Sequence, residues 1–166
     1  MLEKEGISTI IEEGTVTNKL DTSIPTFYQA YAISRTYVEN TLHNYANLKL
    51  IIDLHRDAIP RENSYIEING VNYAKILFVQ GVRYEKYEEN MKLAKKISDK
   101  VSSKYPGMSK GIMIKDQTYQ HDSYNQDLST QAILLELGSN NNTWEEITNT
   151  ISALAPIIKE VLYEES

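Results

Sequence analysis

Residues 48–57 read LKLIIDLHRD, and this stretch decides the fold. Its first seven residues are almost continuously apolar, which is typical of a strand covered on both faces of a sheet. A second run of this kind, QAILLELG at residues 131–138, carries Glu136 near its end. If the two strands are parallel, as helical crossovers require, His55 and Glu136 lie at the same carboxyl edge of the sheet, where open α/β sheets place their sites.

Strand and helix patterns alternate outward from these two runs. Asn69-Gly70 between two short β-branched and aromatic arms predicts a hairpin with a type I′ turn. Thr143 and Glu146 match a capping box at the start of a final helix. Helices are expected at residues 26–47, 87–101 and from 143 on, and strands at residues 7–11, 48–54, 65–68, 71–79, 111–114 and 131–137. The sequence therefore predicts a single α/β domain with a largely parallel sheet, flanking helices and one β-hairpin.

Composition narrows the possible functions. The 166 residues include no cysteine and three histidines, so only His, Asp and Glu could bind a metal. The net charge of −6 argues against a general nucleic-acid binder, because a polyanion requires a dominant basic surface. No apolar run is long enough to span a bilayer.

The two residues at the predicted sheet edge each allow two interpretations. A histidine beside a carboxylate suits a metal-assisted hydrolase, but spacing alone favours a hydrogen-bonded histidine at the end of a strand for His55. A carboxylate buried at Glu136 must be paired, metal-bound or held at a raised pKa, and the structural alternative is a salt bridge at the end of the strand, for example to Arg56. Asp53 could orient the imidazole of His55, since residues two apart on a strand share a face.

Several motifs give the chain a specific resemblance. They are DLHRD at 53–57, NYAK at 72–75, YPG at 105–107, KGI at 110–112, YNQDL at 124–128 and LELG at 135–138. In this order they resemble the catalytic domain of the stage II sporulation protein P (SpoIIP) family, the sporulation branch of the zinc-dependent N-acetylmuramoyl-L-alanine amidases. The resemblance implies a zinc-amidase fold of the phosphorylase/hydrolase-like type. It also implies that the protein cleaves the amide between N-acetylmuramic acid and L-alanine in peptidoglycan during engulfment.

The resemblance also implies roles for individual residues. His55 resembles a zinc-binding histidine of the family, and Glu136 resembles its catalytic glutamate, which acts as general base for a zinc-activated water. Arg56, Asn125 and Gln126 are the candidates for holding the substrate or the oxyanion. In the family, the first strand ends in a histidine motif followed by a glutamate, which supply the other two zinc ligands, and nothing before Asp53 matches them. We therefore expect residues 1–166 to be an N-terminally truncated amidase domain.

Two functions follow from this comparison. The first is a zinc amidase of peptidoglycan. The family implies a location between the mother-cell and forespore membranes, with membrane association in the full-length protein. It also implies two partners, the transglycosylase SpoIID and the membrane protein SpoIIM. The second, favoured by the missing ligands, is a metal-free module that binds peptidoglycan or acts as a scaffold while retaining the amidase fold.

Overall fold

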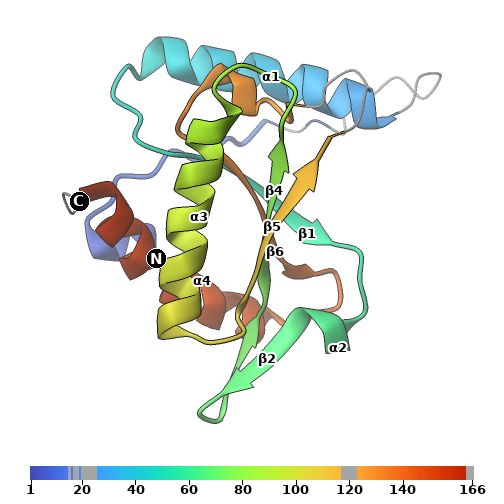
Figure 1. The fold of residues 1–166 in the computed structure, drawn as a ribbon. Helices are drawn as coiled ribbons and strands as arrows, with labels where there is room; N and C mark the ends of the chain where they lie inside the picture. Colours follow the sequence, from blue (N-terminus) through green and yellow to red (C-terminus); the bar gives the residue numbers. More distant parts are fainter. Residues whose placement is uncertain (15, 17–18, 20–25, 117–122, 164–166) are drawn as a thin grey trace.

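The computed structural model describes residues 1–14, 16, 19, 26–116 and 123–163 (Figure 1). The α-helices are α1 (Thr26–Asn44), α2 (Arg61–Ser64), α3 (Tyr87–Lys104) and α4 (Trp144–Tyr163), and two 3-10 helices are η1 (Leu2–Glu5) and η3 (Gln126–Leu128). The strands are β1 (Ile51–Asp57), β2 (Tyr65–Ile68), β3 (Val71–Ala74), β4 (Ile76–Gly81), β5 (Ser109–Lys115) and β6 (Ala132–Ser139). Helices and strands alternate along most of the chain, so the α/β prediction is confirmed.

The main sheet has the strand order β1-β6-β4-β5, and β2 and β3 form a separate antiparallel hairpin. β1 runs parallel to β6, and β4 runs parallel to β5. The central pair, β4 and β6, is antiparallel, so the sheet consists of two parallel pairs that run in opposite directions. The prediction of a largely parallel sheet is confirmed, including the parallel arrangement of the two strands that carry His55 and Glu136.

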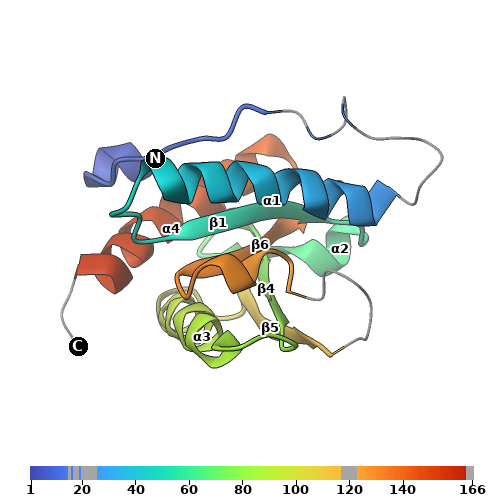
Figure 2. The same cartoon turned by 90° about the horizontal axis from the view of Figure 1, so that it is seen from above.

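The hydrophobic core lies on one face of the sheet, beneath α3 and α4. Both helices lie on the same side of the strands in two perpendicular views (Figures 1 and 2). The core is built from buried apolar side chains of the central strands and of these helices: Ile76, Phe78, Ile133, Leu135, Leu137, Ala94, Ile97, Val101, Leu154 and Ile157. Glu136 lies between Leu135 and Leu137, so its side chain belongs to the opposite face.

That opposite face is only partly covered. Tyr31 of α1 is 6% exposed, and its ring lies parallel to that of His55, with 6.3 Å between the centroids. α1 therefore lies over the sheet at the β1 edge, as Figure 2 shows. Farther across the sheet, at β5, Met113 lies opposite Val79 on the Glu136 face, and its side chain is 42% exposed. The uncovered area leaves room for a site on this face.

Two sequence predictions are wrong. Residues 7–11 do not form a strand, and none of them is paired with a strand among the described residues; Ile7 packs against the core while Ile10 and Ile11 are exposed. A β-branched run becomes a strand only where another strand offers hydrogen bonds. Residues 48–54 were expected to be covered on both faces, but β1 is at the edge of the sheet and Leu54 is 57% exposed.

The local signals for turns and caps are confirmed. Asn69 and Gly70 have φ values of 52° and 78°, the two positive angles that a type I′ turn requires. The backbone N–H of Thr143 donates to Glu146 Oε2 at 3.0 Å, and the N–H of Glu146 donates to Thr143 Oγ1 at 3.2 Å. These reciprocal bonds form the predicted capping box at the start of α4.

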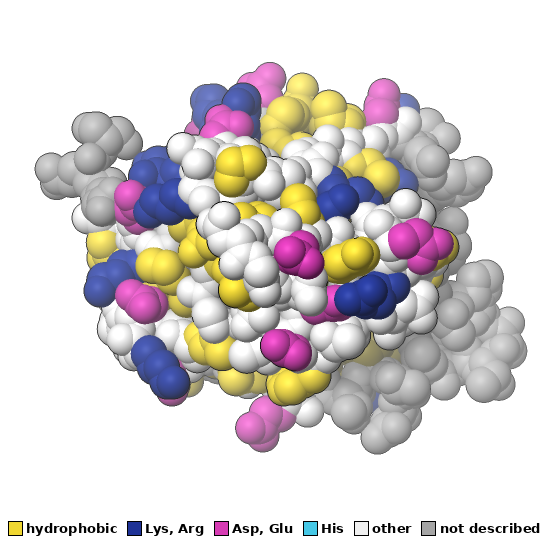
Figure 3. All heavy atoms as spheres, turned by 90° about the horizontal axis from the view of Figure 1, so that it is seen from below, with side chains coloured by type: hydrophobic (Ala, Val, Ile, Leu, Met, Phe, Trp, Pro, Cys, Tyr) yellow, Lys and Arg dark blue, Asp and Glu magenta, His cyan; other side chains and the backbone are white. Residues whose placement is uncertain are grey.

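The surface has no strongly basic region on the face drawn in Figure 3, where basic and acidic side chains are interspersed with apolar ones. This distribution agrees with the net charge of −6. Within the described ranges, no helix is both long enough and apolar enough to cross a membrane.

The position of the core predicts the cost of two matched substitutions. Ile76 on β4 is 0% exposed, whereas Ile114 on β5 is 57% exposed. Ile76→Ala should lower the free energy of unfolding by about 2–5 kcal/mol, because it leaves a cavity in a packed interior. Ile114→Ala should change it by less than about 0.5 kcal/mol. Urea denaturation of the two variants measures both values, and equal losses would contradict the burial of Ile76 in the core.

Candidate functional site

The candidate site is built on the pair of parallel strands β1 and β6. In their register, His55 lies opposite Glu136, and Glu136 lies opposite Leu77 of β4 on its other side. Residues that face one another across neighbouring strands point to the same side of a sheet. The sheet therefore places the imidazole and the carboxyl group side by side on the face that α3 and α4 leave free.

His55 is held by a neighbour on its own strand. Its Nε2 lies 3.0 Å from Asp53 Oδ1, so the predicted contact between these residues is present. This hydrogen bond raises the pKa of His55 above 6.5, although burial acts in the opposite direction. A carboxylate that holds one nitrogen of an imidazole orients the ring and leaves the other nitrogen available, which is the usual arrangement around metal-binding histidines.

One oxygen of Glu136 has no hydrogen-bond partner among the described residues. Its Oε2 atom is buried and accepts no hydrogen bond from the described residues. Burial raises the pKa of Glu136 above 4.5, while the nearby charges of His55 and Lys110 lower it. No salt bridge joins Glu136 to Arg56 in the described part of the chain, so the predicted pairing with Arg56 is wrong. A desolvated carboxylate with a free oxygen is suited to accept a proton.

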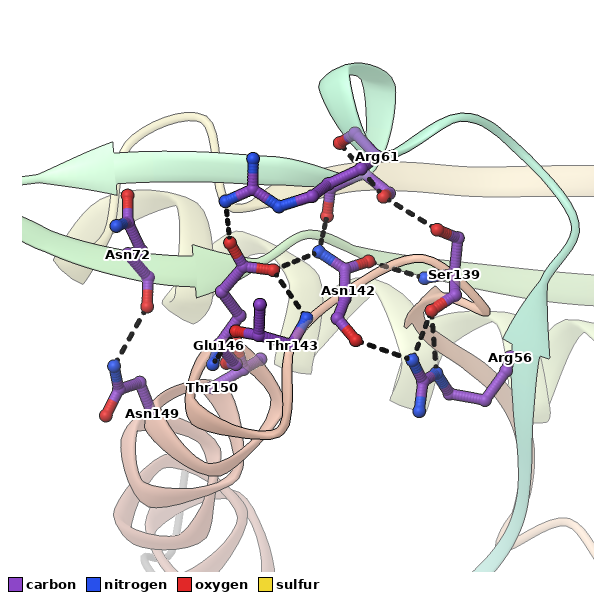
Figure 4. Close-up of polar contacts among 10 residues, drawn as sticks. Arg56, Arg61, Asn72, Ser139, Asn142, Thr143, Glu146, Asn149 and Thr150 are labelled. Atoms are coloured by element: carbon purple, nitrogen blue, oxygen red, sulfur yellow. Dashed lines mark hydrogen bonds and ion pairs between the residues drawn. The ribbon is translucent and has the colours of Figure 1, made fainter.

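Arg56 has internal partners. Its Nε donates to the carbonyl oxygen of Ser139 at 2.9 Å, and its Nη2 donates to the carbonyl oxygens of Ser139 and Asn142 (Figure 4). Arg56 therefore ties β1 to the loop that follows β6. Its predicted contact with substrate stays a prediction.

Asn125 and Gln126 also have internal partners. Asn125 Nδ2 donates to the carbonyl oxygen of Tyr31 and to Ser34 Oγ, which fixes the turn against α1. Gln126 is 2% exposed; its Oε1 accepts from the backbone N–H of Gly81, and its Nε2 donates to the carbonyl oxygen of Val79. These bonds place both residues beside the β4 end and α1, and their predicted contact with substrate is a prediction still.

A buried polar network lies next to the strand that carries Glu136. Asn142 Oδ1 accepts from the N–H of Ser139 at 2.7 Å, and its Nδ2 donates to Glu146 Oε2 at 2.8 Å (Figure 4). Glu146 also accepts from Arg61. Burial alone would raise the pKa of Glu146, but hydrogen bonds from Asn142, Arg61 and the Thr143 backbone lower it. The capping box indicated Glu146 from the sequence, but no sequence signal links it to Arg61.

Gly138 shows how closely this network approaches the strand. Its φ is +63°, and a Cβ atom there would lie 2.6 Å from Asn142 Oδ1 and 2.9 Å from Ala74 Cβ. Only glycine allows this backbone angle without strain and this close approach of Asn142. The network therefore fixes the chain two residues beyond Glu136.

The described residues do not form a complete metal site. Protein zinc sites have at least three protein ligands, whereas no three His, Asp or Glu side chains in the described ranges lie close enough together to hold a metal ion. His55 fits the role of one ligand, because Asp53 orients its ring. Another histidine, His121, lies outside the described residues.

The fold and the site together define a class of protein: an α/β domain with a histidine and a carboxylate side by side on neighbouring parallel strands. One oxygen of this carboxylate accepts no hydrogen bond from the described residues. The family model "Stage II sporulation protein P (SpoIIP)" matches residues 1–159. The chain belongs to this family. It therefore has a role in sporulation.

A curated relative agrees with this assignment. The chain is 33% identical over 163 residues to stage II sporulation protein P of Bacillus subtilis (strain 168). The match covers 98% of this chain and 41% of the relative, so the chain spans about two fifths of the relative's length. No solved structure matches significantly.

The unpaired oxygen of Glu136 predicts a stabilising substitution. The folded-state pKa of Glu136 is raised, so ionising it costs stability as the pH rises through that folded pKa. Glu136→Gln removes the charge and should melt at a higher temperature than the parent at pH 8. At pH 4, below the unfolded pKa of 4.5, the two proteins should melt at similar temperatures. Thermal denaturation at both pH values measures this, with the exposed Glu67→Gln as control; a less stable Glu136→Gln protein at pH 8 contradicts it.

The contacts of Arg56 predict a destabilising substitution. Arg56→Ala leaves the carbonyl oxygen of Ser139 without its side-chain donor, and hydrogen bonds to charged groups contribute about 1.5–3 kcal/mol. The matched control is Arg83→Ala, whose ion pair with Asp116 is exposed and should contribute less than about 1 kcal/mol. Chemical denaturation provides both free energies. A loss at Arg56 no larger than the loss at Arg83 would show that the tie between β1 and the loop is unimportant.

Proposed function

We propose that this domain hydrolyses the amide bond between N-acetylmuramic acid and L-alanine in peptidoglycan during sporulation. The single observation that carries the proposal is the pairing of His55 with Glu136 across β1 and β6, with Glu136 Oε2 buried and free of hydrogen-bond partners in the described chain. Family membership supports the role in sporulation, and the resemblance of the motifs to zinc amidases supports the reaction.

In this proposal Glu136 is the general base. A carboxylate with a raised pKa takes a proton from the attacking water more readily than an ordinary surface carboxylate does. After the water has attacked the carbonyl carbon of the amide, Glu136 returns the proton to the departing nitrogen, so the amine leaves neutral. The pH dependence then follows from the base, because Glu136 must be ionised and activity falls as the pH drops through its raised pKa.

His55 is the residue of this chain that would bind zinc. When bound, zinc lowers the pKa of a coordinated water toward neutrality and polarises a carbonyl group. Asp53 holds one nitrogen of His55 and so orients the ring for a metal at the other nitrogen. Because the described residues supply one clear ligand, the proposal requires further ligands from elsewhere in the protein.

A second candidate function is a metal-free module that binds peptidoglycan or acts as a scaffold. The absence of a three-residue metal cluster in the described part of the chain favours it. For either function we propose peptidoglycan as the partner and a location outside the cytoplasm, between the mother-cell and forespore membranes, with attachment to a membrane in the full-length protein. SpoIID and SpoIIM are the protein partners proposed with this location.

An assay with purified sacculi as the substrate tests the proposed amidase activity directly. The protein should release stem peptides, detected by chromatography and mass spectrometry, and Glu136→Gln should lower the rate at least about 100-fold, as expected for loss of a general base. A zinc chelator and His55→Ala should each abolish release.

Matched exposed residues provide the controls. Glu67→Gln and His43→Ala change exposed residues away from the His55–Glu136 pair and should leave the rate unchanged. If the parent protein releases no stem peptide but still binds sacculi in the presence of chelator, the amidase proposal is wrong and the binding module is favoured.

A further inference from the structure

A small cavity lies beside Glu136 on the uncovered face of the sheet. Its lining includes Glu136, Leu77, Asp57 and two lysines, Lys75 and Lys110. Leu77 lies directly opposite Glu136 in the β4–β6 register, so the cavity begins at the proposed catalytic carboxylate and extends toward β5. Neither lysine has a place in the function proposed above.

Both lysines are on the same face of the sheet as Glu136. Lys75 comes two residues before Leu77 and one before the fully buried Ile76, so alternation places its side chain on the Glu136 face. The ammonium group of Lys110 is close enough to Glu136 to lower the pKa of that carboxyl group. Two cations therefore border one cavity with the reacting group.

The existing partners of the two lysines are weak. Lys110 Nζ lies 4.0 Å from Asp57 Oδ2, and their side chains are 34% and 28% exposed. An ion pair at this distance and exposure contributes little. Lys75 is half-buried and makes no ion pair with any described residue. A partly desolvated ammonium group is stabilised when it binds an anion, so the two lysines make the cavity suitable for a carboxylate.

We propose that Lys75 and Lys110 bind a carboxylate of the peptide portion of the substrate, one or two residues from the amide that is cleaved. This inference rests on the proposed amidase function and deepens it, because it assigns a preference for acidic stem peptides over amidated ones. The ammonium group of Lys110 acts on both Asp57 and Glu136, so a carboxylate bound by the lysines lies close to the proposed catalytic group.

Binding to the Glu136→Gln variant tests the inference without turnover. Isothermal titration calorimetry compares two muropeptides that differ only in a carboxylate or a carboxamide on the second residue of the peptide. The carboxylate form should bind about tenfold more tightly, the effect of one charge-assisted hydrogen bond. Lys75→Gln and Lys110→Gln, added singly, should reduce that difference, and Lys110→Arg should retain it.

Lys92→Gln is the matched control, because Lys92 is 72% exposed on α3 and should leave the preference intact. Equal affinity for the two muropeptides, or a preference that survives both lysine substitutions, overturns the inference. Failure of the proposed function looks different. In that case the unmodified protein does not cleave sacculi, whatever the lysines bind. If the parent protein cleaves both muropeptides with equal KM, the amidase proposal stands and the carboxylate site is wrong.

Discussion

The parallel ladder between β1 and β6 is the constraint on which the site depends. The two strands lie far apart in the sequence, at Ile51–Asp57 and Ala132–Ser139, yet their register brings His55 directly opposite Glu136. A shift of one residue would turn one of the two side chains to the opposite face, because side chains alternate along a strand. The same register directs Leu135 and Leu137 into the core, so burial of the apolar residues and placement of the carboxylate are enforced together.

The polar network at the end of β6 keeps this ladder in place. Arg56 crosses from β1 to the carbonyl oxygen of Ser139, and Asn142 joins Ser139 to Glu146 at the start of α4 (Figure 4). Buried polar groups of this kind contribute when all of them are paired. Glu136, a few residues away, has an oxygen that no described residue pairs. The contrast separates the carboxylate that stabilises the domain from the one that is free to react.

The sequence predicted elements where local chemistry is strong. The hairpin at Asn69-Gly70 and the capping box of Thr143 and Glu146 both depend on contacts within a few residues, and both are confirmed. The prediction of a strand at residues 7–11 was wrong, because strand formation depends on a partner strand elsewhere in the chain. The continuous apolar pattern of β1 wrongly predicted that both faces of this strand are buried, because an apolar strand can also lie at a sheet edge. The antiparallel pairing of β4 with β6 also has no local signal.

For the candidate site, the sequence by itself determined which residues could react: one histidine and one glutamate near the ends of apolar runs, within motifs that resemble a family of amidases. Only the tertiary structure decided that these two residues face each other, that Glu136 lacks a salt bridge to Arg56 in the described chain, and that Arg56, Asn125 and Gln126 have internal partners. The physical reason is the distance along the chain over which each effect acts. Residue type and periodicity act over a few residues, whereas burial, desolvation and pairing of a charge depend on strands and helices that the chain brings together from distant positions.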